Sequence, residues 1–151
     1  MKETPKPNVI VMAEDDADDR LLIKDAVNEC NWDVDLRFVE NGEELLDYLL
    51  RRGKYDQAAT APRPGLILLD LNMPRKDGRE VLREIKATAE LRRIPVVVLT
   101  TSRADTDIEG IYELGANSFI SKPVQFDGLV SLMKLLGQYW FKTVALPATR
   151  A

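Results

Sequence analysis

Several short apolar stretches of the sequence end at a residue that carries a charge or a hydroxyl group. These residues are Glu14 with Asp15, Asp70, Thr100 and Lys122. Gathered carboxylates repel one another, by around 4 kcal/mol for unit charges about 4 Å apart at an effective dielectric constant of 20. A hard divalent cation relieves this repulsion, and oxygen ligands without histidine or cysteine suit Mg²⁺ or Mn²⁺. If the fold brings these residues together, they predict a metal site with a lysine beside it.

A carboxylate held beside a metal and a lysine is a candidate nucleophile toward phosphorus and would form an acyl phosphate. Asp70 is the best candidate, because it ends the central apolar stretch and is expected to face both Asp15 and Lys122. The metal and the ammonium would neutralise charge on the transferring phosphoryl group. We expect Glu14 and Asp15 to hold the cation, with the backbone carbonyl of Asn72 completing the ligand set.

Composition excludes several other kinds of chemistry. The chain has 151 residues and no histidine, which excludes histidine-dependent hydrolysis and imidazole metal ligation within it. A net charge of −4 argues against nucleic-acid binding. No apolar run approaches the roughly 20 residues that cross a bilayer, and the single cysteine cannot form an internal disulfide. We therefore expect one cytoplasmic domain with neither nucleic acid nor membrane as a partner.

Short apolar runs alternate with longer amphipathic stretches along the chain. The expected strands are residues 8–13, 34–39, 65–69, 95–99 and 117–121. The expected helices are residues 16–30, a helix after the turn at 41–42, then 78–88, 105–114 and 126 to about 140. This alternation predicts an α/β fold with a doubly wound, five-stranded parallel sheet in the order 2-1-3-4-5. Ligands bind beyond the carboxyl ends of such strands. The residues described above are therefore expected to lie together at this edge of the sheet, which we call the rim.

In combination, these motifs resemble the receiver domain of two-component response regulators. The residues that carry the resemblance are Glu14-Asp15, Asp70 through Gly78, Thr100 and Lys122-Pro123. The resemblance implies a flavodoxin-like receiver fold with five helices, in which Asp70 accepts a phosphoryl group from a phosphohistidine of a separate sensor histidine kinase, with Mg²⁺ bound. It also implies that Thr100 and Phe119 form the conformational switch, and that the peptide bond before Pro123 is cis.

Two positions depart from the usual receiver pattern, and other features narrow the resemblance. The first acidic position is Glu14 rather than Asp, and Phe119 lacks the hydroxyl that Tyr supplies in many relatives. The insertion at 53–64 and the ending Tyr139-Trp140-Phe141 resemble the small response regulators of phytochrome-type histidine kinases. We expect residues 1–7 to form a flexible N-terminus, 8–141 the receiver domain and 142–151 a C-terminal tail.

We interpret the chain as a stand-alone switch that phosphorylates itself and slowly loses its phosphoryl group, rather than as a turnover enzyme. One alternative is a metal-dependent phosphohydrolase that works through an aspartyl phosphate at Asp70. Such enzymes of the haloacid-dehalogenase type carry an acid/base aspartate two residues after the nucleophile, where this chain has Asn72. The other alternative is a degenerate receiver that binds partners without phosphate, against which the complete set of rim residues argues.

Some nearby residues have simpler explanations. Asp16 is suited to cap the first helix, and Asp18 and Asp19 are favourable near the positive end of the helix dipole. Cys30 ends an apolar helical face, where a small buried hydrophobic residue is the more common role.

The last helix carries more apolar residues than one face of a sheet requires. They are Phe126, Leu129, Val130, Leu132, Met133, Leu135, Leu136, Tyr139, Trp140 and Phe141. A helix that covers a sheet needs an apolar arc of only about 100°. The surplus predicts an exposed patch and a homodimer built on this helix and the C-terminal tail. The alternative is that the tail folds back over the helix.

Overall fold

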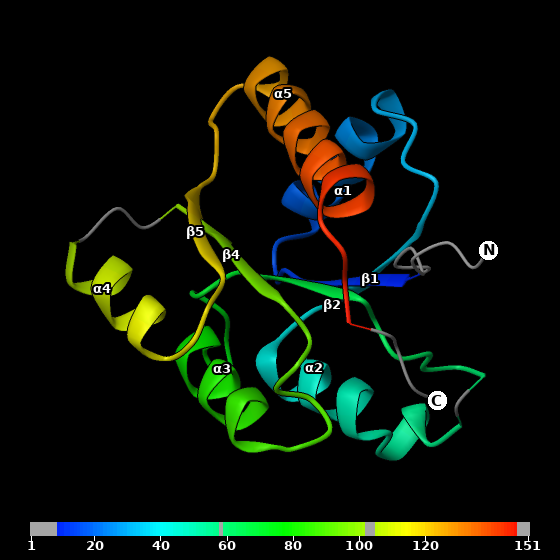
Figure 1. Cartoon of the computed structure of the whole chain (residues 1–151), viewed down its shortest axis with the longest axis vertical. Helices are drawn as coiled ribbons and strands as arrows, with labels where there is room; N and C mark the ends of the chain where they lie inside the picture. Colours follow the sequence, from blue (N-terminus) through cyan, green and yellow to red (C-terminus); the bar gives the residue numbers. More distant parts are fainter. Residues whose placement is uncertain (1–8, 58, 102–104, 148–151) are drawn as a thin grey trace.

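The computed structural model of the protein describes residues 9–57, 59–101 and 105–147, so the expected flexible N-terminus at 1–7 lies outside the described residues. Five parallel strands form one sheet in the order β2-β1-β3-β4-β5 (Figure 1), which confirms the predicted fold class. The strands are β1 (Val9–Ala13), β2 (Asp35–Val39), β3 (Leu66–Leu69), β4 (Val96–Thr100) and β5 (Ser118–Ser121).

Helices cover both faces of the sheet (Figure 1). The helices are α1 (Ala17–Glu29), α2 (Gly42–Leu50), α3 (Gly78–Ala87), α4 (Asp105–Glu113) and α5 (Phe126–Gly137). The pair α1 and α5 packs on one face, and α2, α3 and α4 contribute to the core on the other. A 3₁₀ turn, Gly53–Tyr55, lies within the long connection from α2 to β3. The chain continues beyond α5 as a π-helical segment, Gln138–Thr143, where we expected the last helix to run on to about residue 140.

The apolar core explains why the central strands are continuous apolar runs. Val9, Val11 and Ala13 of β1 point toward α2 and α3, whereas Ile10 and Met12 point toward α1 and α5. Every residue of β1, β3 and β4 is buried, because each of these strands has a neighbour on both sides and helices on both faces. The edge strand β5 is only half-buried along its length.

The part of the C-terminal tail that the structure describes, residues 142–147, folds back over the face that carries α1 and α5. Trp140 and Leu146 are 8% and 9% exposed and belong to the same apolar cluster as α1 and α5. This covering accounts for part of the apolar surplus of the last helix, as the alternative expected. Leu135 and Tyr139, one helical turn apart, remain 61% and 50% exposed. Within the described residues, no helix is both long and apolar enough to span a bilayer.

Local signals at helix ends are confirmed. The Asp16 carboxylate accepts hydrogen bonds from the backbone N–H groups of Asp18 and Asp19, at 2.8 and 3.1 Å, and so caps α1. Gly115, which follows α4, has a φ of +100°. This is the left-handed conformation that glycine supplies most readily at the end of a helix.

Candidate functional site

The carboxyl ends of β1 and β3 lie side by side and bring three carboxylates together. Ala13, the last residue of β1, pairs with Leu69, the last residue of β3. Glu14, Asp15 and Asp70 therefore leave the sheet next to one another, and one carboxylate oxygen from each lies within 4.8 Å of the others. Glu14 and Asp70 are buried whereas Asp15 is exposed, so the cluster opens to solvent on one side.

The loop after β3 holds the Asp70 carboxylate in place. The backbone N–H of Asp70 donates to the carbonyl of Ala13 at 3.1 Å, and the N–H of Asn72 donates to Asp70 Oδ1 at 3.3 Å. The loop closes where the N–H of Gly78 donates to the carbonyl of Leu71 at 2.9 Å. A Cβ atom at Gly78 would lie 2.7 Å from the Asp70 carbonyl oxygen, so only glycine permits this approach.

Lys122 brings a positive charge to the carboxylates from the end of β5. Its ammonium donates to Glu14 Oε1 and lies 3.4 Å from Asp70 Oδ2. It also lies 3.2 Å from Asp19 Oδ2 on the first turn of α1. The structure thus gathers the acids and the lysine that the sequence placed at the ends of different strands.

The prediction of a cis peptide bond before Pro123 is wrong for this structure, in which no described peptide bond is cis. The trans form is favoured before proline by about 0.5–1 kcal/mol. With a trans bond, the N–H of Lys122 still donates to the carbonyl of Thr100 at 2.8 Å. Pairing with β4 therefore continues one residue past β5, and the lysine side chain reaches the carboxylates without a cis bond.

Asp19 and Arg20 belong to the surroundings of the site, and sequence reasoning did not assign them there. Asp19 follows Asp15 by four residues, a spacing that places both on one side of the chain as α1 begins, and this was the available signal. Arg20 Nη1 donates to the Glu14 carbonyl at 2.8 Å, and Nη2 pairs with Glu40 at 3.2 Å. Arg20 thereby connects the loop after β1 to the loop after β2.

Burial and charge act against each other at the site. Burial raises the pKa of Glu14 to about 7, and it outweighs the hydrogen bond and charge of Lys122, which lower that pKa. Burial alone would lower the pKa of Lys122, but the hydrogen bond to Glu14 and the charge of Asp70 outweigh it and raise that pKa. Three carboxylates with one ammonium leave an excess of negative charge, which favours a second cation.

The donor set fits a hard divalent cation. The clustered ligand atoms of Glu14, Asp15 and Asp70 are all carboxylate oxygens. The exposed position of Asp15 leaves room for water ligands, which Mg²⁺ and Mn²⁺ retain in protein sites.

The two proposed switch residues lie at different positions in their strands, one at the rim and one farther from it. Thr100 is fully buried at the end of β4, and its Oγ1 lies 3.5 Å from Nδ2 of Asn72. Phe119 pairs with Val98 in the middle of β5 and packs, half-buried, against the core on the side of α2 and α3. Its backbone N–H donates to the Tyr112 hydroxyl of α4 at 3.2 Å, a contact that sequence reasoning missed.

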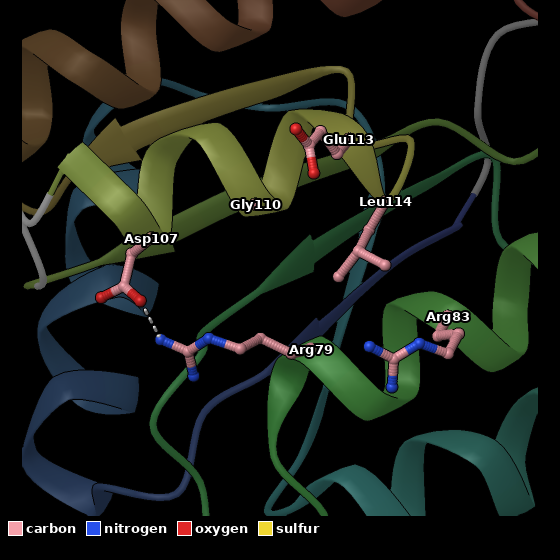
Figure 2. Close-up of a pocket in the computed structure, with 6 residues that line it drawn as sticks. All are labelled: Arg79, Arg83, Asp107, Gly110, Glu113 and Leu114. Carbon is pink, nitrogen blue, oxygen red and sulfur yellow. Dashed lines mark hydrogen bonds and ion pairs between the residues drawn. The ribbon is translucent and has the colours of Figure 1, made fainter.

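A separate pocket of about 280 Å³ lies between α3 and α4 (Figure 2). Arg79 of α3 reaches across it to Asp107 of α4, with 2.6 Å between guanidinium and carboxylate. Because α3 follows the Asp70 loop and α4 follows β4, this ion pair connects the helices that come after Asp70 and Thr100. No spacing in the sequence indicated this pair.

Residues 10–134 match the family model described as the response regulator receiver domain. The response regulator Rcp1 of Synechocystis is 40% identical over 146 residues, which cover 97% of each chain. The crystal structure of Mn²⁺-bound Rcp1 superposes with a TM-score of 0.85 at 41% identity, over 95% of this chain and all of that one. The phosphorylated cyanobacterial phytochrome response regulator RcpA gives a TM-score of 0.86 at 42% identity, over 94% of this chain and 99% of that one.

Proposed function

The chain belongs to the response regulator receiver domain family and is homologous to phytochrome response regulators, and on that premise we propose that Asp70 accepts a phosphoryl group from a sensor histidine kinase. We propose further that this kinase is of the phytochrome type and that the cation is Mg²⁺. The phosphorylated chain then signals through protein–protein contacts.

One observation carries this proposal. The carboxylate oxygens of Glu14, Asp15 and Asp70 share one small region, and the Lys122 ammonium lies 3.4 Å from Asp70. Asp70 belongs to the acidic cluster and also lies near the lysine, and a nucleophile toward phosphorus needs such positive charge on its flank.

The residues of the chain act on the phosphoryl group in distinct ways. One Asp70 oxygen attacks phosphorus, a P–O bond forms, and the P–N bond to the donor imidazole breaks with its electron pair leaving on nitrogen. Lys122 neutralises charge on the equatorial oxygens, and its neighbours Glu14 and Asp19 hold its ammonium at the rim. Attack by water on the acyl phosphate later restores Asp70, which gives slow autodephosphorylation.

We assign the cation ligands to Glu14, Asp15, Asp70 and the backbone carbonyl of Asn72. Mg²⁺ bound there would offset negative charge on the nucleophile and on the incoming phosphoryl oxygens. Glu14 would then be shared between the cation and Lys122, whose ammonium donates to Glu14 Oε1.

The switch is assigned to Thr100 and Phe119. The Thr100 hydroxyl is buried within reach of Asn72, beside the loop that carries Asp70. Phosphorylation adds roughly −1.5 to −2 charges and three acceptor oxygens, which give this hydroxyl a new partner. Movement of Thr100 then allows Phe119, half-buried beneath α4, to repack.

Intact-mass measurement after incubation with acetyl phosphate and Mg²⁺ tests the proposal. We expect one phosphoryl adduct, which Asp70→Asn abolishes and chelation of the metal prevents. Asp56→Asn, which alters an exposed aspartate in the connection from α2 to β3, is the matched control and should retain the adduct. An adduct that persists in Asp70→Asn would contradict the assignment. Multiple-turnover release of phosphate from many esters would instead favour the phosphohydrolase.

Exposed apolar side chains beside the rim suit a docking surface for the kinase. They are Leu21, Leu22, Val124 and Phe126. The contact of Lys122 with Asp19 brings the start of α1 close to the loop after β5, and these side chains belong to the two segments that begin there. We expect Leu22→Lys to slow phosphotransfer from a phytochrome-type kinase about tenfold, since loss of a contributing interface side chain costs more than about 1 kcal/mol. Acetyl phosphate should still modify it, and Leu50→Lys on α2 should change neither reaction.

We also propose a homodimer through α5 and the C-terminal tail. Its support is now narrower than the sequence indicated, because Trp140 is covered by its own chain. The exposed pair Leu135 and Tyr139 is the remaining apolar face. Light scattering of Leu135→Lys/Tyr139→Lys should give the monomer mass, while Leu21→Lys should leave the dimer intact. A dimer that survives the double substitution would contradict this interface.

A further inference from the structure

A second pocket lies at the opposite edge of the sheet from Asp70. It has a volume of about 410 Å³ and is formed by the loop between α1 and β2 and by the end of α5 with the π-helical segment. That loop leads into the amino end of β2, whereas Asp70 follows the carboxyl end of β3. The volume falls within the range of roughly 300–1,000 Å³ that small-molecule sites occupy. The pocket shares no residue with the candidate phosphorylation site.

Two aromatic rings form an ordered wall of this pocket. Trp32 and Phe141 both line it, with ring centroids 4.9 Å apart and ring planes at 90°. The indole Nε1 of Trp32 donates to the Met133 carbonyl at 3.0 Å. A Cβ atom at Gly137 would lie 2.7 Å from that nitrogen, so glycine is required for the indole to rest on α5. Trp32 is therefore fixed without a ligand, and binding need not spend free energy on ordering it.

The backbone around the pocket adopts two uncommon conformations. Asn31 has a φ of 52°, in the left-handed region that asparagine tolerates better than most residues. Gln138–Thr143 is π-helical, a conformation that is rare and frequently found at functional sites. Both features border the pocket, and the second carries Phe141 and Lys142 to its wall.

The charges that line the pocket favour an anion. Lys134 and Lys142 line it, and neither forms an ion pair within the part of the chain that the structure describes. Asp33 is the one acidic residue in the lining. A lining with two ammonium groups and one carboxylate is net positive, although the whole chain carries −4.

We propose that this pocket binds a small aromatic anion, with its ring against Trp32 and Phe141 and its carboxylate or sulfonate attracted by both Lys134 and Lys142. Perpendicular ring planes offer a flat ligand a stacking surface and an edge contact at once. A lysine that lines the pocket and forms no ion pair there can donate a charge-assisted hydrogen bond to the anionic group. This site would act independently of Asp70, so the two proposals can fail separately.

The fluorescent probe 8-anilinonaphthalene-1-sulfonate tests the proposal, with the uncharged N-phenyl-1-naphthylamine as the matched ligand. We expect saturable binding of the sulfonate with the near-ultraviolet circular dichroism of the fold retained. Lys134→Gln and Lys142→Gln should each weaken it about fivefold, the effect of one charge pair near 4 Å in water. Asp33→Asn should tighten binding of the sulfonate, and none of these changes should alter binding of the uncharged amine.

Two controls and one location test complete the experiment. Lys24→Gln, which removes an exposed lysine of α1 outside the pocket, and Asp70→Asn should both bind the sulfonate as the unaltered chain does. Cys30 is the single cysteine of the chain and lines the pocket, so bound ligand should slow its alkylation by N-ethylmaleimide.

The proposal is overturned if the sulfonate shows no saturable binding up to about 1 mM, the weak end of specific recognition. It is equally overturned if the lysine substitutions leave binding unchanged, if Cys30 is not protected, or if the probe binds only as the native circular dichroism is lost.

Discussion

The two halves of the candidate site are held in place by different means. On the β1 and β3 side, Glu14 and Asp70 follow fully buried strands, and their backbone N–H groups donate to Val39 and Ala13 at 3.0 and 3.1 Å. On the α4 side, Ile111 is the one buried side chain among those of the helix that the structure describes. The acids are therefore fixed by the core, whereas α4 rests on it lightly.

Two polar contacts also attach α4 to the rest of the protein. Arg79 pairs with Asp107, and the Tyr112 hydroxyl accepts from the N–H of Phe119. Exposed ion pairs contribute only about 0–1 kcal/mol each, far less than a buried core residue. Chemistry requires groups in fixed positions, and signalling requires an element that a modest change in free energy can move. We expect the β1 and β3 side to serve the first need and the α4 side the second.

The largest effect is expected from Lys122→Met, which acts on the carboxylates of the β1 and β3 side. The substitution leaves the buried carboxylates of Glu14 and Asp70 without their counter-charge, and breaking such a buried pair costs about 3–5 kcal/mol. Urea unfolding of the metal-free protein should show this loss, and millimolar Mg²⁺ should recover part of it by supplying another cation. Lys24→Met on the exposed face of α1 is the control. A loss below about 1 kcal/mol would mean that Lys122 does not neutralise these acids.

The next effect is the pH dependence of stability, and it also arises on the β1 and β3 side. Burial raises the pKa of Glu14 from 4.5 to about 7, so between these values the folded protein binds more protons than the unfolded chain. Stability of the metal-free protein should therefore fall as pH rises from about 4.5 to about 7, by at most about 3 kcal/mol. The raised pKa of Lys122 does not act in this window, because its contribution is lost only above the ordinary lysine value of 10.5.

Urea unfolding at a series of pH values, without divalent cations, measures this slope. Glu14→Gln should remove it, since glutamine does not titrate, while Glu109→Gln on the exposed face of α4 should leave it unchanged. A slope that survives in Glu14→Gln must come from another group.

The β1 and β3 side of the site could be predicted from the sequence for a physical reason. A strand covered on both faces must be apolar throughout, so β1 and β3 are visible as continuous runs and their ends as the first polar residues, Glu14 and Asp70. Parallel connections then place those ends at one edge. The sequence pattern thus determined both the sheet order and the convergence of the acids.

Side-chain contacts between separate helices and loops could not be predicted from the sequence. Neither the pairing of Asp19 with Lys122 nor that of Arg79 with Asp107 could be predicted, because each joins side chains on separate elements whose relative placement the sequence does not show. The apolar surplus of α5 left a similar ambiguity, since burial of Trp140 by the chain itself or by a partner requires the same residue type. The resemblance to receivers led to one error, the cis bond before Pro123.

A smaller and stabilising effect is expected in the α4 half. A Cβ atom at Gly110 meets nothing within 4 Å, so Gly110→Ala gains helix propensity without a clash. We expect about 1 kcal/mol of added stability and slower hydrogen exchange within α4. Gly137→Ala on α5 is the contrasting variant, because its Cβ would meet Trp32 at 2.7 Å and should destabilise the fold. Equal effects of the two substitutions would contradict the light attachment of α4.

The smallest effect is expected from Arg79→Met, which removes the ion pair across the pocket in Figure 2. The two side chains are 34% and 25% exposed, so solvent screens the pair and its loss should cost about 0.5 kcal/mol. A double-mutant cycle with Asp107→Asn isolates this coupling, which matters because Asp107 makes other interactions as well. Amide exchange should then quicken in α4 and stay unchanged in β1 and β3. If exchange in β3 quickened equally, the two halves would open as one unit, and movement of α4 would carry Asp70 with it.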